Sequence, residues 1–561
     1  MIRKLDCFFL VFTALCIGLA ACDSREENAS AGAPVVEAQE QVPAAGLQGA
    51  LATPEYGGTY VTATIGEPSN LIPPLATDSA SHEVADLLYV SLLKYNKNLE
   101  VVPEAAQSFE VLDDGKHLRF TLRPGILWND GVELTAEDVE FTYKLYVDPK
   151  TPTAYAESYN LVKLFKVTGK YTFEVFYDKP FARALTSWMA DILPKHVLEH
   201  ENLLDTKYSR NPVGAGPYRL SEWKEGTRLV LTANETYFDG RPFFDRIVYR
   251  IIPDQATTFL ELKAHNLDYM GLTPPQYKFQ TSGPEWDKNF NKYEYLSFGY
   301  TYLGYNLTSP IFADKRVRQA FAHTIDKQAI VKGVLLGLGK PVIGPYKPGT
   351  WVYNESITDY ALDTAQAKAL LAEAGWVDSD GDGLLDKDGQ PFEFTIMTNQ
   401  GNESRIKAAT IIQANLAAIG VRAKIRTVEW SALLKEFIDK SAFEVLVMGW
   451  NIIIDPDIYN VWHSSKAVPG GLNFVGYKNT ELDALLDTGR HTVGQAERKV
   501  IYDRVQEILH EDQPYTFLFC PLSLPIVAAR VQGIEPAPAG ITHNFEKWWI
   551  PSDLQNSAMQ Q

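Results

Sequence analysis

The amino-acid sequence predicts a mixed α/β fold with at least two packed lobes. Its 561 residues exceed the size at which one hydrophobic core keeps growing, so more than one core is expected. A strand pattern at residues 58–66 (GTYVTATIG) is followed by helical spacing of apolar residues from Val84 to Leu92. Because strands and helices keep mixing along the chain, the fold class is mixed.

Turn and cap residues mark the first elements. Ser81 or His82 stands where a cap of the first helix would lie. Residues 113–115 (DDG) predict a hairpin turn, since the next segment, 117–122, alternates between polar and apolar residues.

Two later helices have defined starts. Thr135 can cap a helix in which Asp138 occupies the third position of a capping box. A strand at residues 247–251 is followed by a Pro-Asp step, so the next helix is expected to begin at Asp254.

The charge balance restricts the partners. A net charge of -18 would repel phosphate backbones, so nucleic acid is not an expected partner.

No HExxH, GxSxG or phosphate-cradling GxxxxGK[ST] motif occurs, and the histidines are scattered. The sequence therefore predicts a binding protein rather than an enzyme.

The N-terminal segment has the layout of a secretory signal. Arg3 and Lys4 precede an apolar run that is short for a membrane span and ends in LAAC. This ending matches the bacterial lipobox, which predicts a signal peptide at 1–21 and lipid on Cys22. In enteric-type Gram-negative lipoproteins, an Asp such as Asp23 resembles a retention signal for the inner membrane.

A tether and a lone thiol complete this description. Residues 22–54 are rich in Ala, Gly, Glu, Gln and Pro without an apolar face, which predicts a lipidated disordered tether. Cys520 lies in the apolar run FLFCPL without a neighbouring base, so a buried structural thiol is favoured over a nucleophile.

Several stretches together resemble a known family. They are LRPGILWNDGVELTAEDVEFTYK (122–144), NPVGAGPYRL (211–220), FADKRVRQAFAHTIDKQAIV (312–331), IIQANLAAIGVRAKI (411–425) and MGWNIIIDPDIYNVWHSS (448–465). Their order and spacing are similar to family 5 of the extracytoplasmic solute-binding proteins, the oligopeptide-, dipeptide- and nickel-binding lipoproteins of ABC importers. Oligopeptide-binding members are the nearest in look.

The resemblance implies a two-lobed periplasmic-binding-protein fold of type II (cluster C), with an extra subdomain and a ligand cleft between the lobes. Lobe I would comprise 55–300 and 511–561, with the subdomain at about 96–210, and lobe II would comprise 301–510. The crossing segments would be 298–306 and 514–519, which could act as hinges.

Aromatic residues are candidates for lining this cleft. Trp430 and Trp450 match positions that lie in or beside the solute pocket of the family, whereas their residue type alone favours core packing. Tyr300 and Tyr302 share one face of the crossing strand, where either cleft lining or core packing fits.

The charged anchors of peptide-binding members are missing or moved. Where those members place an Asp for the ligand ammonium, this chain has Asn451 and three isoleucines, and Asp455 or Asp457 could replace it. Alternatively, Asp455 begins a helix with Pro456 in its first position. Where dipeptide-binding members hold the ligand carboxylate with an Arg, this chain has Asn399. Both departures argue against a dedicated dipeptide binder.

An acidic loop raises the question of calcium. In DSDGDGLLDKDG (378–389), Gly389 replaces the bidentate Glu of an EF-hand, and a strand rather than a helix is expected next. A helix begun by Asp363 or Thr364 and stopped by Gly375 should precede the loop. The favoured interpretation is a hairpin turn, and the weak candidates for a structural calcium ion are Asp378, Asp380, Asp382 and Asp386.

The sequence thus predicts a lipid-anchored, monomeric periplasmic receptor that captures oligopeptides and passes them to the permease of an ABC importer. No cofactor is expected apart from that calcium ion. The alternatives are another solute in the same fold, such as an oligosaccharide, an opine or a metal chelate, or a different class, a periplasmic hydrolase or a calcium-stabilised surface protein.

Overall fold

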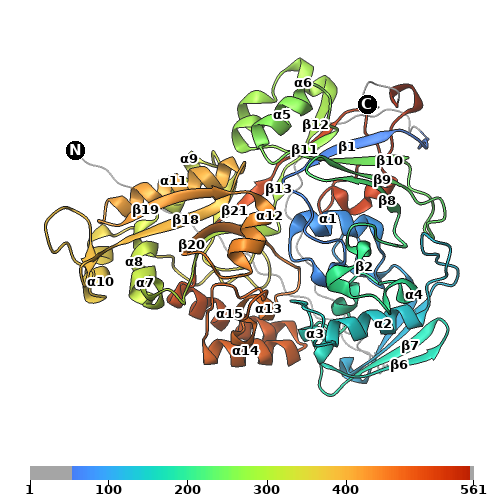
Figure 1. Ribbon diagram of the computed structural model, residues 1–561, viewed down its shortest axis with the longest axis horizontal. Coiled ribbons are helices and arrows are strands. Elements are labelled where there is room, and N and C mark those ends of the chain that lie inside the picture. The colour runs from blue at the N-terminus through green and yellow to red at the C-terminus, as the bar shows by residue number, and fades with distance from the viewer. Residues whose placement is uncertain (1–52, 556–561) are drawn as a thin grey trace, which may run out of the picture. The chain divides into compact units, whose positions relative to one another are not determined.

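The computed structural model describes residues 53–555, and all of these except Thr53 belong to one compact unit that begins at Pro54 (Figure 1). Strands and helices are mixed throughout this unit, which confirms the predicted class. The signal segment 1–21, Cys22 and Asp23 lie outside the described residues, as does nearly all of the predicted tether.

A four-stranded sheet begins the fold, in the order β1 (Thr59–Thr64), β10 (Arg246–Ile251), β9 (Arg228–Ala233), β8 (Tyr218–Lys224). β1 runs parallel to β10, and the other pairs are antiparallel. Helix α1 (Ser79–Leu88) is capped by Asp78, whose carboxylate accepts a hydrogen bond from the Ser81 amide. The prediction of Ser81 or His82 as the cap was wrong because the helix begins earlier.

A second four-stranded sheet is antiparallel, in the order β4 (Ala106–Leu112), β5 (His117–Leu122), β7 (Thr172–Tyr177), β6 (Val162–Gly169). The predicted hairpin at 113–115 joins β4 to β5, and all three turn residues have positive φ. Helix α2 (Ala136–Val147) contacts β6 and carries the predicted capping box between Thr135 and Asp138.

A seven-stranded sheet dominates the rest of the unit. Its path runs β13 (Tyr295–Leu296), β21 (Tyr515–Ser523), β14 (Gly299–Tyr305), β20 (Val445–Asn451), β18 (Glu393–Asn399), β19 (Arg422–Val428), with β15 (Gly339–Pro341) also paired to β21. The two expected crossing segments are β14 and β21, which lie side by side as antiparallel partners. Helix α11 (Glu403–Ala417) connects β18 to its parallel neighbour β19 and packs on both.

Further elements surround these sheets, including α5 (Gln255–Lys263), which Asp254 caps as predicted. The others are α3 (Glu157–Asn160), α4 (Lys195–Leu198), α6 (Pro284–Asn289), α7 (Pro310–Ala313), α8 (Lys315–Thr324), α9 (Lys327–Gly333), α10 (Thr364–Glu373), α12 (Trp430–Ala432), α13 (Tyr459–Trp462), α14 (Thr480–His491), α15 (Gln495–Asp512), β2 (Leu93–Tyr95), β3 (Val101–Pro103), β11 (Tyr269–Gly271), β12 (Phe290–Lys292), β16 (Asp386–Lys387), β17 (Gln390–Pro391) and β22 (Pro525–Ala528).

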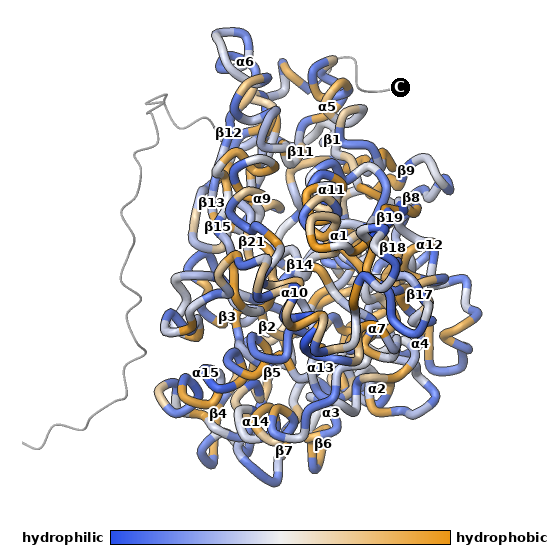
Figure 2. The backbone as a smooth tube through the Cα atoms, turned by 90° about the vertical axis from the view of Figure 1, so that its left-hand side faces the viewer, coloured by the Kyte–Doolittle hydropathy of each residue, from blue (hydrophilic) through white to orange (hydrophobic). Residues whose placement is uncertain are grey.

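Hydrophobic residues alternate with hydrophilic ones along much of the backbone (Figure 2). The buried hydrophobic residues form three clusters. The first combines both ends of the described chain, from Tyr60 to Phe290 and from Leu524 to Ile550. The other two consist of residues between Tyr300 and Cys520. Cys520 is 1% exposed, and burial raises the pKa of its thiol, as expected for a structural cysteine. The predicted lobe boundaries stay a prediction.

Candidate functional site

The carboxyl ends of three parallel strands meet at one edge of the seven-stranded sheet. β18 pairs in parallel with both β19 and β20, and these strands end at Asn399, Val428 and Asn451. Ligands of open α/β sheets bind beyond the carboxyl ends of the strands. This sheet edge therefore carries three of the residues predicted from sequence, Asn399, Trp430 and Trp450.

The parallel strands β1 and β10 of the first four-stranded sheet end against the same edge. After β1, Gly66 packs on Trp430 so closely that a Cβ atom there would lie 2.9 Å from the Trp430 Cβ. After β10, the Gln255 side chain accepts a hydrogen bond of 3.1 Å from the Glu403 amide. A Cβ at Gly401, whose φ is +77°, would lie 2.1 Å from the Pro253 carbonyl oxygen. The strand ends of the two sheets thus face each other.

The two tryptophans differ in their surroundings. Trp430 starts α12 and is 7% exposed, and its indole N–H has no hydrogen-bond partner in the described part of the chain. Trp450 is half-buried, donates a hydrogen bond of 3.3 Å to the Tyr515 hydroxyl and stacks on Phe474. Buried indole N–H groups usually find a partner, and those of Trp128 and Trp462 are also without one among the described residues.

Tyr300 and Tyr302 are both buried on β14. Tyr300 stands opposite Trp450 in the strand register, at the same end of β20. Tyr302 is 1% exposed and stacks on Tyr515 with 3.9 Å between ring centroids. Burial, reinforced by Tyr515, raises the pKa of Tyr302 well above its ordinary value. Both rings pack in the core beside the edge, and their predicted contact with ligand stays a prediction.

Asn399 is 2% exposed and bonds to an arginine that the sequence analysis did not single out. Its side-chain oxygen accepts a hydrogen bond of 2.8 Å from Arg405 Nη1. Arg405 lies in the first turn of α11, where its amide donates to the capping residue Asn402. Burial lowers the pKa of Arg405 to about 10. In the sequence, Arg405 looks like an ordinary charge on a helix surface, so no local signal marks it.

Asp455 and Asp457 are both engaged in ion pairs. Asp455 binds Arg498 through two hydrogen bonds of 2.8 and 2.9 Å. Asp457 lies 3.0 Å from Arg490 and 3.5 Å from Arg183, and its side chain is 1% exposed. Burial would raise the pKa of Asp457, but the two arginines outweigh it and hold that pKa below its usual value.

The alternative interpretation of Asp455 was wrong. No helix starts there, because the Asp455 carboxylate accepts a hydrogen bond from the Asp457 amide in a turn, and α13 begins only at Tyr459. The predicted roles of Asp455 and Asp457 as ligand anchors stay predictions.

A cavity of about 240 Å³ lies beside Asp455. Tyr95 and Thr186 line it together with Asp455 and Arg498. The Thr186 hydroxyl and Arg498 Nε are buried there without a hydrogen-bond partner in residues 53–555. Apolar residues, among them Trp351 and Val493, also line this cavity.

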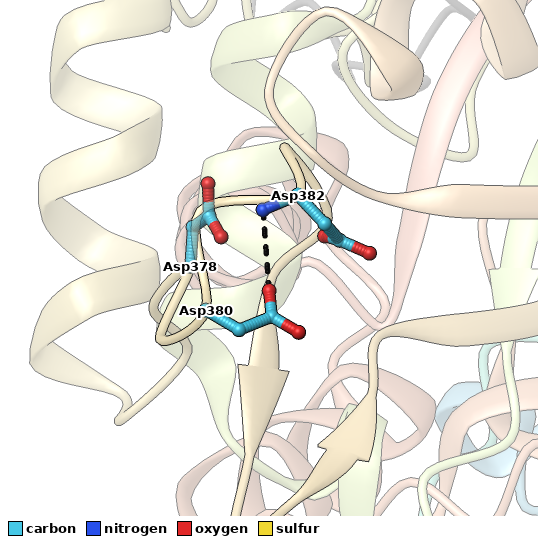
Figure 3. Close-up of side chains that lie close together, drawn as sticks. All are labelled: Asp378, Asp380 and Asp382. Carbon is cyan, nitrogen blue, oxygen red and sulfur yellow. Dashed lines mark hydrogen bonds between the residues drawn. The ribbon is translucent and has the colours of Figure 1, made fainter.

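The acidic loop has the predicted turn geometry. α10 is capped by Asp363, Gly375 follows it with positive φ, and the β16–β17 hairpin turns at residues 388–389. Asp378, Asp380 and Asp382 place carboxylate oxygens within 4.8 Å of one another, and Figure 3 shows the Asp382 amide donating to Asp380. Asp386 lies outside this group and accepts from the Ser379 hydroxyl instead. The strand β18, rather than a helix, follows the hairpin.

Within residues 53–555, no helix combines the length and apolar character needed to cross a membrane.

Comparison with known proteins agrees with this arrangement. Residues 100–470 match the model of the bacterial extracellular solute-binding proteins, family 5. The chain is 34% identical to the oligopeptide-binding protein AppA of Bacillus subtilis, over 96% of this chain and 97% of that protein. The structure of AppA in complex with a nonapeptide superposes with a TM-score of 0.85 and covers 89% of this chain and 100% of AppA.

Two further solved structures are similar. NikZ of Campylobacter jejuni in complex with Ni(L-His) has a TM-score of 0.79 at 27% identity, covering 88% of this chain and 99% of that chain. DppA of Helicobacter pylori in complex with the peptide STSA has the same TM-score and identity, covering 88% of this chain and 98% of that chain. The chain belongs to family 5 of the bacterial extracellular solute-binding proteins.

Proposed function

We propose that the chain is the lipid-anchored substrate-binding component of an ABC importer, and that it captures oligopeptides where the ends of its two sheets face each other. The contact of Gly66 with Trp430 carries this proposal, because it brings the carboxyl ends of strands from two sheets together, and ligands of open α/β sheets bind beyond such ends. The similarity to AppA, whose structure contains a nonapeptide, supports a peptide as the solute.

The side chains at this edge suit a peptide backbone. Trp430 and Trp450 offer aromatic surface, while the unpaired indole N–H of Trp430 can donate to a peptide carbonyl. The carboxylates of Asp455 and Asp457 are already paired with arginines, so they leave little charge for a ligand ammonium. This arrangement favours longer peptides that are held along their backbone.

Ligand binding can be measured directly. Mass spectrometry under native conditions should reveal co-purified peptides, and calorimetry with peptides of graded length should then give saturable binding that is tighter for longer chains. Trp430→Phe should weaken binding, because it removes the indole N–H but keeps an aromatic ring. Trp286→Phe is the control, since this half-buried tryptophan lies on α6 and stacks on Phe259.

The same experiment separates the alternative solutes. Co-purification of a sugar, an opine or a nickel–histidine chelate, with no response to any peptide, would sink the peptide proposal. Among the described residues, the acidic groups that could hold a metal ion together are the three aspartates of the 378–382 loop. Among residues 53–555, the edge of the seven-stranded sheet offers no such group, so a bare metal ion is not the solute proposed for it.

The lipid anchor needs a separate test. Labelling with radioactive palmitate in a bacterial host should modify the wild-type chain but not Cys22→Ala, which should be released from the membrane fraction. Cys520→Ala is the control and should label normally, because that thiol is buried. Equal labelling of wild type and Cys22→Ala would contradict the proposed anchor.

A further inference from the structure

Two carboxylates on helix α1 line a concave region of the molecule. Glu83 and Asp86 are three residues apart and therefore share one face of the helix. Solvent reaches both side chains, yet burial among the surrounding atoms raises the pKa of Glu83 to about 7 and that of Asp86 to about 6. A carboxylate on a convex surface would not be desolvated in this way. The two groups therefore lie in a recess that water still enters.

A third carboxylate lies close to these two. Asp191 belongs to the segment between β7 and α4. Burial raises the pKa of Asp191 well above its usual value, and the neighbouring Asp86 raises it further. Within residues 53–555, Glu83, Asp86 and Asp191 accept no hydrogen bond and have no lysine or arginine nitrogen within 4.0 Å. We call these three residues the acidic cluster.

The basic side chains nearby do not neutralise the acidic cluster. His82 lowers the pKa of Asp86, but an imidazole carries no charge unless it is protonated. Lys94 lies 3.6 Å from the carboxylate of Glu104 and is paired there. A cation that comes from outside the chain would therefore stabilise the ionised cluster.

Two buried tyrosines next to the acidic cluster have hydroxyl groups without a partner. Tyr249 on β10 and Tyr146 on α2 are each 4% exposed, and neither hydroxyl makes a hydrogen bond within residues 53–555. Burial raises the pKa of both phenols; Glu83 and Asp86 raise that of Tyr249 further, and Asp191 contributes to that of Tyr146. Water still touches both hydroxyls, so they open toward the acidic cluster. Buried hydroxyls normally have a partner, and a ligand entering the recess would supply one.

The spacing of the acidic cluster suits an organic cation better than a metal ion. Among residues 53–555, the acidic groups that bring three ligand oxygens within 4.8 Å of one another are those of the 378–382 loop, not the acidic cluster. An ammonium has three donors and a guanidinium five, so either can contact carboxylates that lie further apart. The phenol rings of Tyr249 and Tyr146 also suit the stem and the charge of such a side chain.

The acidic cluster is near the sheet edge that is proposed to hold the peptide. α1 lies beneath the sheet of β1 in Figure 1, and the loop that leaves β1 through Gly66 leads to it. Burial raises the pKa of Asp439, which follows Trp430 closely in sequence, and Asp78, the cap of α1, also raises it. A long side chain that leaves the peptide backbone at this edge can therefore reach α1. The terminal ammonium of a peptide has no such reach, because it is bound to the backbone itself.

We propose that the acidic cluster, together with the hydroxyls of Tyr249 and Tyr146, binds the cationic side chain of a lysine or arginine in the captured peptide. The proposal rests on the proposed function and adds to it a preference for basic peptides. Lysine and arginine share the positive charge and the long apolar stem that the recess would take.

The test uses the full-length protein in detergent and an N-acetylated nonapeptide without charged side chains. Lysine is placed at each position in turn and compared with norleucine, which keeps the apolar stem without the charge. Calorimetry should give, at one position, an affinity that is at least about tenfold higher for lysine than for norleucine. Arginine at that position should retain the gain.

Variants of the acidic cluster should remove this preference. Glu83→Gln combined with Asp86→Asn should reduce the ratio to about one while the affinity for the norleucine peptide stays unchanged, which also shows that the variant is folded. Glu110→Gln is the control. It removes a carboxylate of β4 that is 56% exposed and pairs with Arg119, so it should keep the preference for lysine.

The wild type alone can overturn the proposal, so a variant that fails to fold does not decide the result. Equal affinity for lysine and norleucine at every position would refute it and leave peptide capture intact. If removal of the acetyl group gives the gain and lysine does not, the cluster binds the terminal ammonium and the proposal fails. Equal loss of preference in the double variant and in Glu110→Gln would also contradict it. If no peptide binds at all, the proposed function fails as well.

Discussion

Two charged regions of the molecule differ in whether each charged side chain has a partner of opposite charge. Around Asp457, an acid whose side chain is 1% exposed lies between Arg490, which is 3% exposed, and Arg183, which is 18% exposed. Around Arg405, by contrast, a guanidinium has an amide oxygen as its nearest partner. In the first region each charged group has an opposite charge within 4.0 Å, so removal of the shared carboxylate is expected to destabilise the fold. In the second region, no carboxylate of residues 53–555 lies within 4.0 Å of the guanidinium.

The largest expected effect concerns the region around Asp457. Asp457→Ala leaves Arg490 and Arg183 without their shared carboxylate, so the free energy of unfolding should fall by about 3–5 kcal/mol. Urea unfolding followed by circular dichroism measures this change. Glu436→Ala is the control, since it breaks an exposed pair with Lys440 and should cost under about 1 kcal/mol. Equal losses in both variants would contradict the difference drawn between buried and exposed pairs.

The pH dependence of stability should sharpen the same comparison. Asp457 has its pKa held below the usual value of about 3.9, so its contribution is fully present above that pH and is lost as pH falls through the lower folded-state pKa. The difference in unfolding free energy between wild type and Asp457→Asn should therefore be constant above about pH 5 and shrink below about pH 4. If the difference in unfolding free energy between the two proteins grew as the pH fell, the pKa of Asp457 would not be lowered in the folded protein.

A smaller effect is expected in the region around Arg405. Arg405→Met removes a charge that has no carboxylate within 4.0 Å among residues 53–555 and keeps much of the side-chain volume. The free energy of unfolding of the ligand-free protein should therefore change by less than about 1 kcal/mol, or rise. Urea unfolding beside Asp457→Ala measures the contrast. A loss as large as that of Asp457→Ala would show that Arg405 stabilises the fold itself.

The smallest expected effect concerns the exposed acidic loop. Asp378, Asp380 and Asp382 make hydrogen bonds within their own turn, and the bidentate Glu of an EF-hand is replaced by Gly389. Calorimetry with millimolar calcium should show no heat of binding. A heat signal that disappears in Asp380→Asn would instead establish a calcium site there.

Local signals predicted much of the fold. The capping box at Thr135, the cap at Asp254 and the hairpin at 113–115 depend on residues that are near one another in sequence, and all three were confirmed. The cap of α1 was wrong by three residues because Ser81 and Asp78 are both good caps, and packing selects between them.

Long-range contacts were beyond the reach of the sequence. The ion pairs of Asp457 with Arg183 and Arg490 join segments 274 and 33 residues apart, so the sequence could not show that this carboxylate is already paired. Arg405 was missed because its surroundings also depend on the fold. It lies on a helix that begins with polar residues, where a charge normally faces solvent, and only the fold places it beside Gly449 and Asn399.

The burial of Cys520 has a practical consequence. Cys520 is the one cysteine within residues 53–555. Its side chain is 1% exposed and the pKa of its thiol is raised, so thiol reagents should react with it slowly. Cysteines introduced on the surface near Gly66 and near Trp430 could then carry a donor and an acceptor dye without removal of the native residue. Single-molecule energy transfer between them would test whether the two sheet edges separate and rejoin as ligand is exchanged.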